Sequence, residues 1–339
     1  MSYRITWIDA QRSFEATGDE TVLEAAQRAG VTLPSECGFG GCGTCRVKLL
    51  AGHVHYAEPP MALSPEETEA GYALMCQARA LADLQISTER VLGAPVPPQR
   101  RTATVLRTEA LSADVTRLVL ALDNRERLVF RPGQYLNVLP GDAGARSFSM
   151  ASRTGDAEIE LHIRRIDGGY FTQDLLSAMR SGDTLEIDAP LGGFGYHEED
   201  YRPIVMVATG TGIAPLRSLL ATMFDDPGLP PVDLYWGGRT RADLYLHGEL
   251  AQLAATREDF RFVPVLSRAD DAWPGARGYV QDAVLADYPD LSEHALYLCG
   301  SPAMIADARR AFGSHGASVR YLYADSFTFQ HPHYVDAAG

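Results

Sequence analysis

The pattern of apolar and polar positions divides the first 90 residues into short strands around an early helix. Alternating apolar positions predict strands at 3–8, 12–16, 46–50 and 84–87. Between the second and third of these strands, residues 21–30 have a helical period that begins at a capping residue and ends at a glycine. The pattern predicts a small domain of mixed α and β structure.

The pattern then changes twice. Residues 93–101 are rich in proline and have no hydrophobic period, which predicts an extended linker. From Pro203 onward, buried strands such as 204–208 alternate with helices, which predicts a parallel sheet. Between these two regions, short alternating segments separated by turn residues predict an antiparallel β-barrel, with strands at 103–108, 115–122, 134–139, 158–164 and 184–188.

A length of 339 residues agrees with two or three domains. The fold class is therefore multidomain, with an α+β domain, an antiparallel barrel and an α/β domain built on a parallel sheet. The expected boundaries are 1–92 for the first domain, 93–101 for the linker, 102–200 for the barrel, 201–325 for the α/β domain and 326–339 for a C-terminal tail.

Composition narrows the functional classes. Hydrophobic residues make up 46% and charged residues 22%, which are ordinary globular values and exclude a disordered chain. The formal net charge of −14 argues against nucleic acid as a partner, because phosphate binding depends on a basic surface. No apolar run approaches the ~18 residues of a membrane span, and the first residues do not resemble a secretory signal. We therefore expect a cytoplasmic protein with no membrane association, and nothing in the sequence demands more than a monomer.

Four of the five cysteines lie in the first quarter of the chain. Cys37, Cys42 and Cys45 have the spacing C-x4-C-x2-C, and Cys76 follows 31 residues after the last of them. This is the plant-type spacing for a [2Fe–2S] cluster, and the glycines between the cysteines allow backbone N–H groups to approach the sulfurs. A zinc site would more typically pair two C-x2-C units, and only one is present. Zinc and inert buried thiols remain the alternatives.

At this point a resemblance is clear: residues 1 to about 90 resemble a plant-type [2Fe–2S] ferredoxin domain. The segment Arg146-Ser147-Phe148-Ser149-Met150-Ala151-Ser152 in turn resembles the Arg-x-aromatic-Ser-x-x-Ser motif of the ferredoxin-NADP reductase superfamily. The resemblance implies that Arg146 offers a fork to phosphate, that the ring of Phe148 lies near the flavin, and that the Ser149 hydroxyl reaches the reactive nitrogen of the flavin. Downstream, a Gly-Gly turn opens a helix whose amides form an anion site. The expected flavin-binding residues are Arg146, Ser147, Phe148, Ser149, His162, Ile163, Arg164, Gly168, Gly169, Tyr170, Phe171, Thr172 and Phe327.

The last domain resembles the nicotinamide domain of the same superfamily. Gly210-Thr211-Gly212 follows a buried strand, where a helix N-terminus accepts pyrophosphate. The resemblance implies that Cys299-Gly300 lies against the nicotinamide. The alternative is that Cys299 is a small buried thiol with a purely structural role. Asp325 occupies the position of a family acid that is usually glutamate, and the chain continues beyond it to residue 339. Ser149, Cys299 and Asp325 are the expected catalytic residues, and Gly210, Thr211, Gly212, Arg239, Cys299 and Gly300 the expected nicotinamide-binding residues.

The domain order resembles the single-chain reductase components of bacterial multicomponent oxygenases. This resemblance implies that electrons pass from NADH through FAD and the [2Fe–2S] cluster, one at a time, to a partner oxygenase. That partner is a Rieske dioxygenase, a cytochrome P450 or a di-iron monooxygenase. Arg239 and Arg241 keep NADPH open as the coenzyme. The alternatives are a reductase that serves a deoxysugar-type dehydratase, a general NADH:acceptor reductase, and a passive electron carrier fused to a degenerate reductase.

The cluster hypothesis makes a prediction about Cys42→Ser. We expect this variant to keep NADH-dependent reduction of ferricyanide, which takes electrons from the flavin, and to lose reduction of cytochrome c. The reason is that a hydroxyl does not replace the thiolate that an iron–sulfur cluster requires. Both rates are measured by absorbance with purified protein. Retention of cytochrome c reduction would mean that electrons bypass the cluster.

Overall fold

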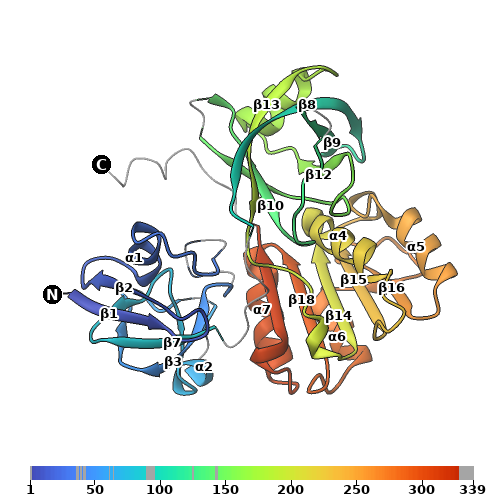
Figure 1. Cartoon of the computed structure of the whole chain (residues 1–339). Coiled ribbons are helices and arrows are strands. Elements are labelled where there is room, and N and C mark those ends of the chain that lie inside the picture. Colours follow the sequence, from blue (N-terminus) through green and yellow to red (C-terminus); the bar gives the residue numbers. More distant parts are fainter. Residues whose placement is uncertain are drawn as a thin grey trace.

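The computed structural model describes residues 2–35, 38, 40, 43–60, 62–63, 65–88, 96–123, 126–141 and 144–327. Three bodies make up the molecule, as Figure 1 shows: an N-terminal domain (blue), a barrel domain above it (green), and a parallel-sheet domain (yellow to red) beside the N-terminal domain. The multidomain fold class expected from the sequence is confirmed. Among the helices of the described ranges, none is long and apolar enough to cross a membrane.

The N-terminal domain is a mixed sheet with a helix packed on it. Its strand order is β2-β1-β7-β3-β5, in which β1 and β7 run parallel and the other pairs run antiparallel. Thr21 and Glu24 form a capping box at the start of α1, which satisfies backbone donors that the helix leaves open. The elements are β1 (Ser2–Trp7), β2 (Arg12–Thr17), α1 (Val22–Arg28), β3 (Arg46–Ala51), β4 (Val54–His55), α2 (Pro65–Glu69), β5 (Tyr72–Leu74), β6 (Arg79–Ala80) and β7 (Leu84–Ser87).

The barrel domain is an antiparallel sheet in the order β11-β10-β13-β8-β9-β12. A bridge between Met150 and Leu161 brings its two ends together, so that the sheet nearly closes. The first strand begins at Gln99 rather than at the expected Ala103, because Gln99 and Arg100 still pair with β13. The elements are β8 (Gln99–Ala110), β9 (Val115–Leu122), β10 (Tyr135–Val138), β11 (Arg146–Ser149), β12 (Ile159–Arg164), a π-helical turn η3 (Tyr170–Leu175), α3 (Leu176–Ala178) and β13 (Thr184–Leu191).

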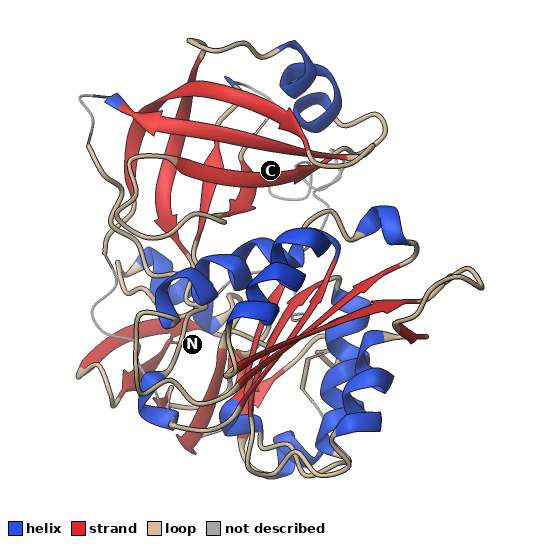
Figure 2. Ribbon diagram, turned by 90° about the vertical axis from the view of Figure 1, so that its right-hand side faces the viewer, coloured by secondary structure: helices blue, strands red, loops and turns tan. Residues whose placement is uncertain are grey.

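The last domain is a parallel sheet in the order β17-β16-β15-β14-β18-β19. Its central strand β14 is buried along nearly its whole length, as expected for a strand covered on both faces. Helices α4 and α5 cover one face of the sheet, and α6 and α7 cover the other (Figure 2). The elements are β14 (Ile204–Thr209), α4 (Ile213–Met223), β15 (Val232–Gly238), α5 (His247–Thr256), β16 (Phe260–Leu266), β17 (Ala276–Arg277), α6 (Val280–Asp287), β18 (Ala295–Gly300), α7 (Pro302–Gly313) and β19 (Leu322–Ser326).

The chain order reverses at β14, which lies between β15 and β18. In open α/β sheets, ligands bind beyond the carboxyl ends of the strands at such a switch point. The turn that follows β14 is a short 3₁₀ helix, η5 (Gly210–Gly212), and it faces the barrel domain through Arg164 of β12. The fold therefore places one end of the barrel over the switch point of the parallel sheet.

A core substitution in the N-terminal sheet should destabilise this domain. Ile86 lies in the central strand β7 and is fully buried, so Ile86→Ala should lower the free energy of unfolding by about 2–5 kcal/mol. The matched change Ile86→Val should cost about 0.5–1.5 kcal/mol. Amide hydrogen exchange of β1 and β7, followed by mass spectrometry in rising urea, measures the difference. Equal exchange in the two variants would contradict the assignment of Ile86 to the core.

Candidate functional site

A cavity of about 930 Å³ lies between the barrel and parallel-sheet domains. Its volume is in the range of cofactor and small-ligand sites. Most of the residues expected from the sequence to bind flavin or nicotinamide, or to act in catalysis, line it: Arg146, Ser147, Phe148, Ser149, His162, Arg164, Gly168, Gly169, Tyr170, Phe171, Thr172, Gly210, Thr211, Arg239, Gly300, Asp325 and Phe327. Segments separated by more than 170 residues therefore meet at one place.

Ser149 and Asp325 lie where the barrel domain contacts the parallel-sheet domain at the cavity. Ser149 is the last residue of β11 in the barrel, and Asp325 lies near the end of β19 in the parallel sheet. Both are buried, and the Ser149 hydroxyl donates a hydrogen bond of 3.4 Å to Oδ2 of Asp325. Asp325 also pairs with Cys299 across β18 and β19. The contact places a hydroxyl and a carboxylate from different domains on one wall of the cavity.

The strand β11 carries the remaining motif residues. Phe148 stands beside Phe171 with ring centroids 5.4 Å apart, which gives this wall an apolar surface. Arg146 Nη1 donates to the carbonyl oxygens of Ala145 and Gly144 at 2.9 and 3.3 Å. These bonds anchor the guanidinium at the rim of the cavity, where the rest of its fork can face an anion.

The Gly168-Gly169 turn leads into the helical segment that begins at Tyr170. Thr172 Oγ1 accepts a hydrogen bond of 3.1 Å from the backbone amide of Ile166, which fixes the loop before the turn. The first amides of a helical segment have no carbonyl partner inside that segment. Because Gly168, Gly169, Tyr170 and Thr172 all line the cavity, this end of the cavity suits a phosphate group.

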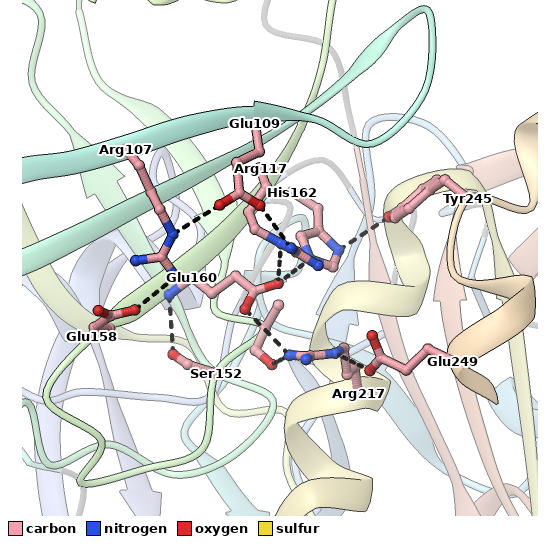
Figure 3. A network of polar contacts seen from close by, with 11 residues as sticks. Arg107, Glu109, Arg117, Ser152, Glu158, Glu160, His162, Arg217, Tyr245 and Glu249 are labelled. Atoms are coloured by element: carbon pink, nitrogen blue, oxygen red, sulfur yellow. Dashed lines mark hydrogen bonds and ion pairs between the residues drawn. The ribbon is translucent and has the colours of Figure 1, made fainter. Parts of the chain in front are cut away.

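A charged network joins the barrel domain to the parallel-sheet domain next to the cavity (Figure 3). The fully buried ring of His162 contacts Glu160 Oε1 at 2.8 Å through Nε2 and the Tyr245 hydroxyl at 3.2 Å through Nδ1. Glu160 also forms ion pairs with Arg117 and Arg217. Figure 3 shows Glu160 lying among these three side chains.

The pKa values of His162 and Glu160 are both lowered, so the hydrogen bond between a neutral imidazole and a charged carboxylate is kept at neutral pH. Burial lowers the pKa of His162, against the raising effect of Glu160. Burial opposes ionisation of Glu160, but the hydrogen bond from His162 and the charges of Arg217 and Arg117 lower its pKa to about 2. The carboxylate is therefore charged and the imidazole neutral at pH 7. Tyr245 and Arg217 come from the parallel-sheet domain, so the network holds that domain against β12.

The loop after β14 packs closely against the end of β18. A Cβ on Gly212 would lie 2.3 Å from the carbonyl oxygen of Cys299, so only glycine fits there. Trp236 Nε1 donates a hydrogen bond of 3.0 Å to the carbonyl oxygen of Gly210, which stabilises the turn. These contacts bring Thr211 and Gly300 to the same edge of the cavity. The arrangement is that of a strand-to-helix turn that receives a phosphate group.

Some expected residues do not line the described cavity. Cys299 is completely buried, and its neighbour Gly300 forms the wall instead. Ile163 is buried in the barrel core, and Gly212 lies behind the wall. Arg239 lines the cavity, whereas Arg241 lies outside its described lining. The roles of these residues therefore stay predictions.

The cavity also includes residues that sequence analysis did not identify. Tyr279 lines the cavity and is 66% exposed, and Ser326 lines it beside Asp325. The Ser326 hydroxyl is buried and has no hydrogen-bond partner among the described residues, so it is available to a ligand. Neither residue belongs to a motif with fixed spacing. Only the Gly278-Tyr279 step at a strand end could have indicated the first of them.

Residues 43–45, the described end of the segment that contains the first three cysteines, lie beside the same wall, and we call them the cysteine loop. The Sγ atoms of Cys45 and Cys76 are 3.0 Å apart and both residues are buried, so the two sulfurs can bind one metal centre. Cys37 and Cys42 lie outside the described residues. Thr44 donates a hydrogen bond of 3.0 Å to the carbonyl oxygen of Ala324, the residue before Asp325. The cysteine loop therefore contacts the strand that forms the cavity wall.

Comparison with known protein families agrees with this geometry. Residues 5–81 match the model of a 2Fe-2S iron-sulfur cluster binding domain. Residues 102–196 match that of an oxidoreductase FAD-binding domain, and residues 206–310 that of an oxidoreductase NAD-binding domain. The three cofactors expected from the sequence, a [2Fe–2S] cluster, FAD and NADH, are thus confirmed at the level of domain families.

Two relatives cover nearly the entire chain. The reductase subunit of an aromatic O-demethylase from Amycolatopsis sp. is 39% identical over 326 residues, which are 94% of this chain and 96% of the relative. Reductase component 1 of terephthalate 1,2-dioxygenase from Comamonas sp. is 33% identical over 331 residues, which are 96% of this chain and 98% of the relative.

A solved structure has the same three-domain arrangement. The crystal structure of an Amycolatopsis cytochrome P450 reductase superposes with a TM-score of 0.71 at 36% identity, over 96% of this chain and 98% of the other. The similarity thus extends over all three domains. The chain belongs to the ferredoxin-NADP reductase superfamily, and within it to the single-chain, NADH-dependent flavin iron–sulfur reductases that are the reductase components of oxygenases.

Proposed function

We propose that the cavity binds FAD and NADH together and that Ser149 and Asp325 lie at the point where the hydride is transferred. The observation that carries this proposal is the Ser149–Asp325 hydrogen bond, which joins the flavin motif of the barrel to the end of β19. Bound FAD would accept two electrons as hydride and release them singly, as an iron–sulfur cluster requires. The residues present fit such a group: they offer an apolar wall, a helix N-terminus and the Ser326 hydroxyl, which has no hydrogen-bond partner in the described part of the chain.

The proposed roles follow from where each residue lies. Arg146 and the amides after Gly169 hold the phosphates of FAD, while Phe148 packs against its ring system. Ser149 donates a hydrogen bond to the reacting nitrogen of the flavin. Asp325 lies within hydrogen-bond distance of the same hydroxyl, at 3.4 Å, so the carboxylate holds the hydroxyl at the cavity wall. Cys299 acts through the backbone, because its side chain is buried and its carbonyl meets Gly212.

For the coenzyme we propose NADH, bound with its pyrophosphate on the turn 210–212. Asp243 lies at the adenosine end, and its Oδ2 accepts hydrogen bonds from the amides of Arg239 and Thr240 at 3.1 and 2.7 Å. The carboxylate is thus fixed beside the place where a 2′-phosphate would lie, and it repels that group. Arg239, which lines the cavity, contacts the pyrophosphate or ribose instead.

We propose a terminal oxygenase as the electron acceptor, in a pathway of aromatic catabolism. The support is the set of relatives, which are named as reductases of an O-demethylase and a dioxygenase. A Rieske dioxygenase, a cytochrome P450 and a di-iron monooxygenase are the classes to test by pairing with the purified reductase.

We further propose that the chain is a cytoplasmic monomer. Free thiols stay reduced most readily in the cytoplasm, and the cavity that we propose for FAD and NADH is lined by residues of one chain. Light scattering after size-exclusion chromatography should give the mass of a single chain, 36.9 kDa. A mass of twice this value would contradict the monomer.

The experiment that tests the proposed function is an anaerobic titration of the purified protein with NADH, and separately with NADPH. We expect NADH to bleach the flavin and to produce the rhombic low-temperature EPR signal of a reduced [2Fe–2S] cluster. NADPH should do so only at much higher concentration. Bleaching with no cluster signal would remove the ferredoxin half of the proposal. No bleaching would remove the reductase function altogether.

Ser149→Ala should slow reduction of the flavin by NADH about tenfold, because a hydrogen bond to the reacting group is worth about 1.4 kcal/mol. Stopped-flow absorbance under argon measures this step. The EPR signal of the dithionite-reduced cluster should be unchanged. Ser177→Ala is a matched control, since Ser177 is exposed and, among the residues that the structure describes, its hydroxyl donates to the carbonyl oxygen of Asp174 alone. An unaltered hydride step in Ser149→Ala would exclude this serine from the site.

A further inference from the structure

Three charged side chains are buried together where the N-terminal domain meets the parallel-sheet domain. Glu67 Oε1 contacts Arg46 Nη1 at 2.9 Å and Arg309 Nη2 at 3.0 Å. The exposed fractions of these side chains are 8% for Glu67, 12% for Arg46 and 10% for Arg309. We call this group the interdomain triad. Ion pairs on the surface contribute little, but a pair withdrawn from water depends strongly on both partners.

The members of the interdomain triad come from different domains. Arg46 begins β3 and Glu67 lies in α2, both in the N-terminal domain, whereas Arg309 lies in α7 of the parallel-sheet domain. Figure 1 shows α7 on the side of the parallel sheet that is turned toward the N-terminal domain. Arg46 adds a second link, because its Nη2 donates to the carbonyl oxygen of Val319 at 2.6 Å. The Glu67–Arg309 pair is therefore a contact across the domain boundary.

The interdomain triad is next to the cysteine loop. Arg46 follows Cys45 directly, and a Cβ on Gly43 would lie 2.5 Å from Nη1 of Arg309. The same loop reaches the cavity wall through the Thr44–Ala324 hydrogen bond. It also reaches the barrel, since a Cβ on Gly193 would lie 3.9 Å from Cγ2 of Thr44. Holding Arg309 against Glu67 thus holds the cysteine loop at the junction of the three domains.

We propose that Arg309 is a positioning residue for electron transfer inside the molecule: its buried ion pair with Glu67 keeps the cysteine loop docked beside the cavity. In the proposal Arg309 acts through the placement of the N-terminal domain, because its ion pair with Glu67 crosses the domain boundary. The inference deepens the reductase function, since it names a side chain that links the flavin side of the molecule to the cluster side.

Arg309→Met removes the guanidinium while Glu67 keeps its partner Arg46, so the N-terminal domain retains a balanced pair and its fold. Arg310→Met is the matched control on the same helix, because Arg310 is 76% exposed and pairs only with Asp307 of its own helix in the described contacts. Arg309→Lys keeps a positive charge, so it should preserve part of the domain docking that Arg309→Met loses.

Two readouts are measured on the full-length holoprotein. The first is the ratio of NADH-dependent cytochrome c reduction to ferricyanide reduction, which reports transfer beyond the flavin. The second is amide hydrogen exchange of residues 43–48 and 319–326, which reports docking without any turnover. We expect Arg309→Met to lower the ratio at least about tenfold, because truncating one partner of a buried charge pair commonly weakens an interface by more than that. Exchange in both segments should rise, and Arg310→Met should change neither readout.

The other outcomes overturn the proposal. Unchanged exchange and an unchanged ratio in Arg309→Met would show that the ion pair does not hold the domains. Faster exchange with an unchanged ratio would show that electron transfer does not depend on this docking. An equal loss of both reductions would place the effect of Arg309 on the nicotinamide side. If the unaltered protein does not reduce its flavin with NADH, the reductase function fails, whereas the exchange experiment still decides whether Arg309 docks the domain.

Discussion

The positions of the N-terminal domain and the barrel relative to the parallel sheet depend on the carboxyl end of β19. There the carbonyl oxygen of Ala324 accepts a hydrogen bond from Thr44, and the carboxylate of Asp325 accepts one from Ser149. Consecutive residues of one strand thus contact the N-terminal domain and the barrel. Because β19 is an edge strand held in register by β18, its position is fixed by the core of the parallel sheet. An electron carrier with three domains needs such a rigid reference point, since small displacements change transfer strongly.

Ion pairs that are largely or partly withdrawn from water hold the domains around this point. On one side, Glu160 of the barrel binds Arg217 of α4, with His162 and Tyr245 completing the network. On the other side, Glu67 of the N-terminal domain binds Arg309 of α7. A hydrophobic interface of equal area would not select one orientation so sharply, because charge pairs fix register and repel misplaced partners. The parallel-sheet domain supplies the arginine in both contacts.

Sequence motifs could predict the components of the site because each motif has a local mechanical role. Each of these motifs acts within a few residues of sequence, so its spacing can be recognised in the sequence. They are the Gly210–Gly212 turn, the Arg146–Ser149 strand and the Gly168-Gly169 turn. Ser326 and Tyr279 could not be predicted in this way. Each contributes one side chain to a wall made by distant segments, and only the folded chain brings such segments together. The strand β8 begins earlier than its own pattern indicated, because pairing with β13 extends it.

The sequence by itself determined the order of the three domains and the cysteine spacing, because turns, helix N-termini and metal ligands depend on local residue types. Through the resemblance of its motifs to those of a known superfamily, it also indicated the cofactors. Only the tertiary structure decided that Asp325 meets Ser149, that Cys299 is buried behind Gly300, and that Arg309 pairs with Glu67. These contacts join residues separated by up to 242 positions. Their partners are chosen by how whole domains pack, and that choice leaves no periodic signal along the chain.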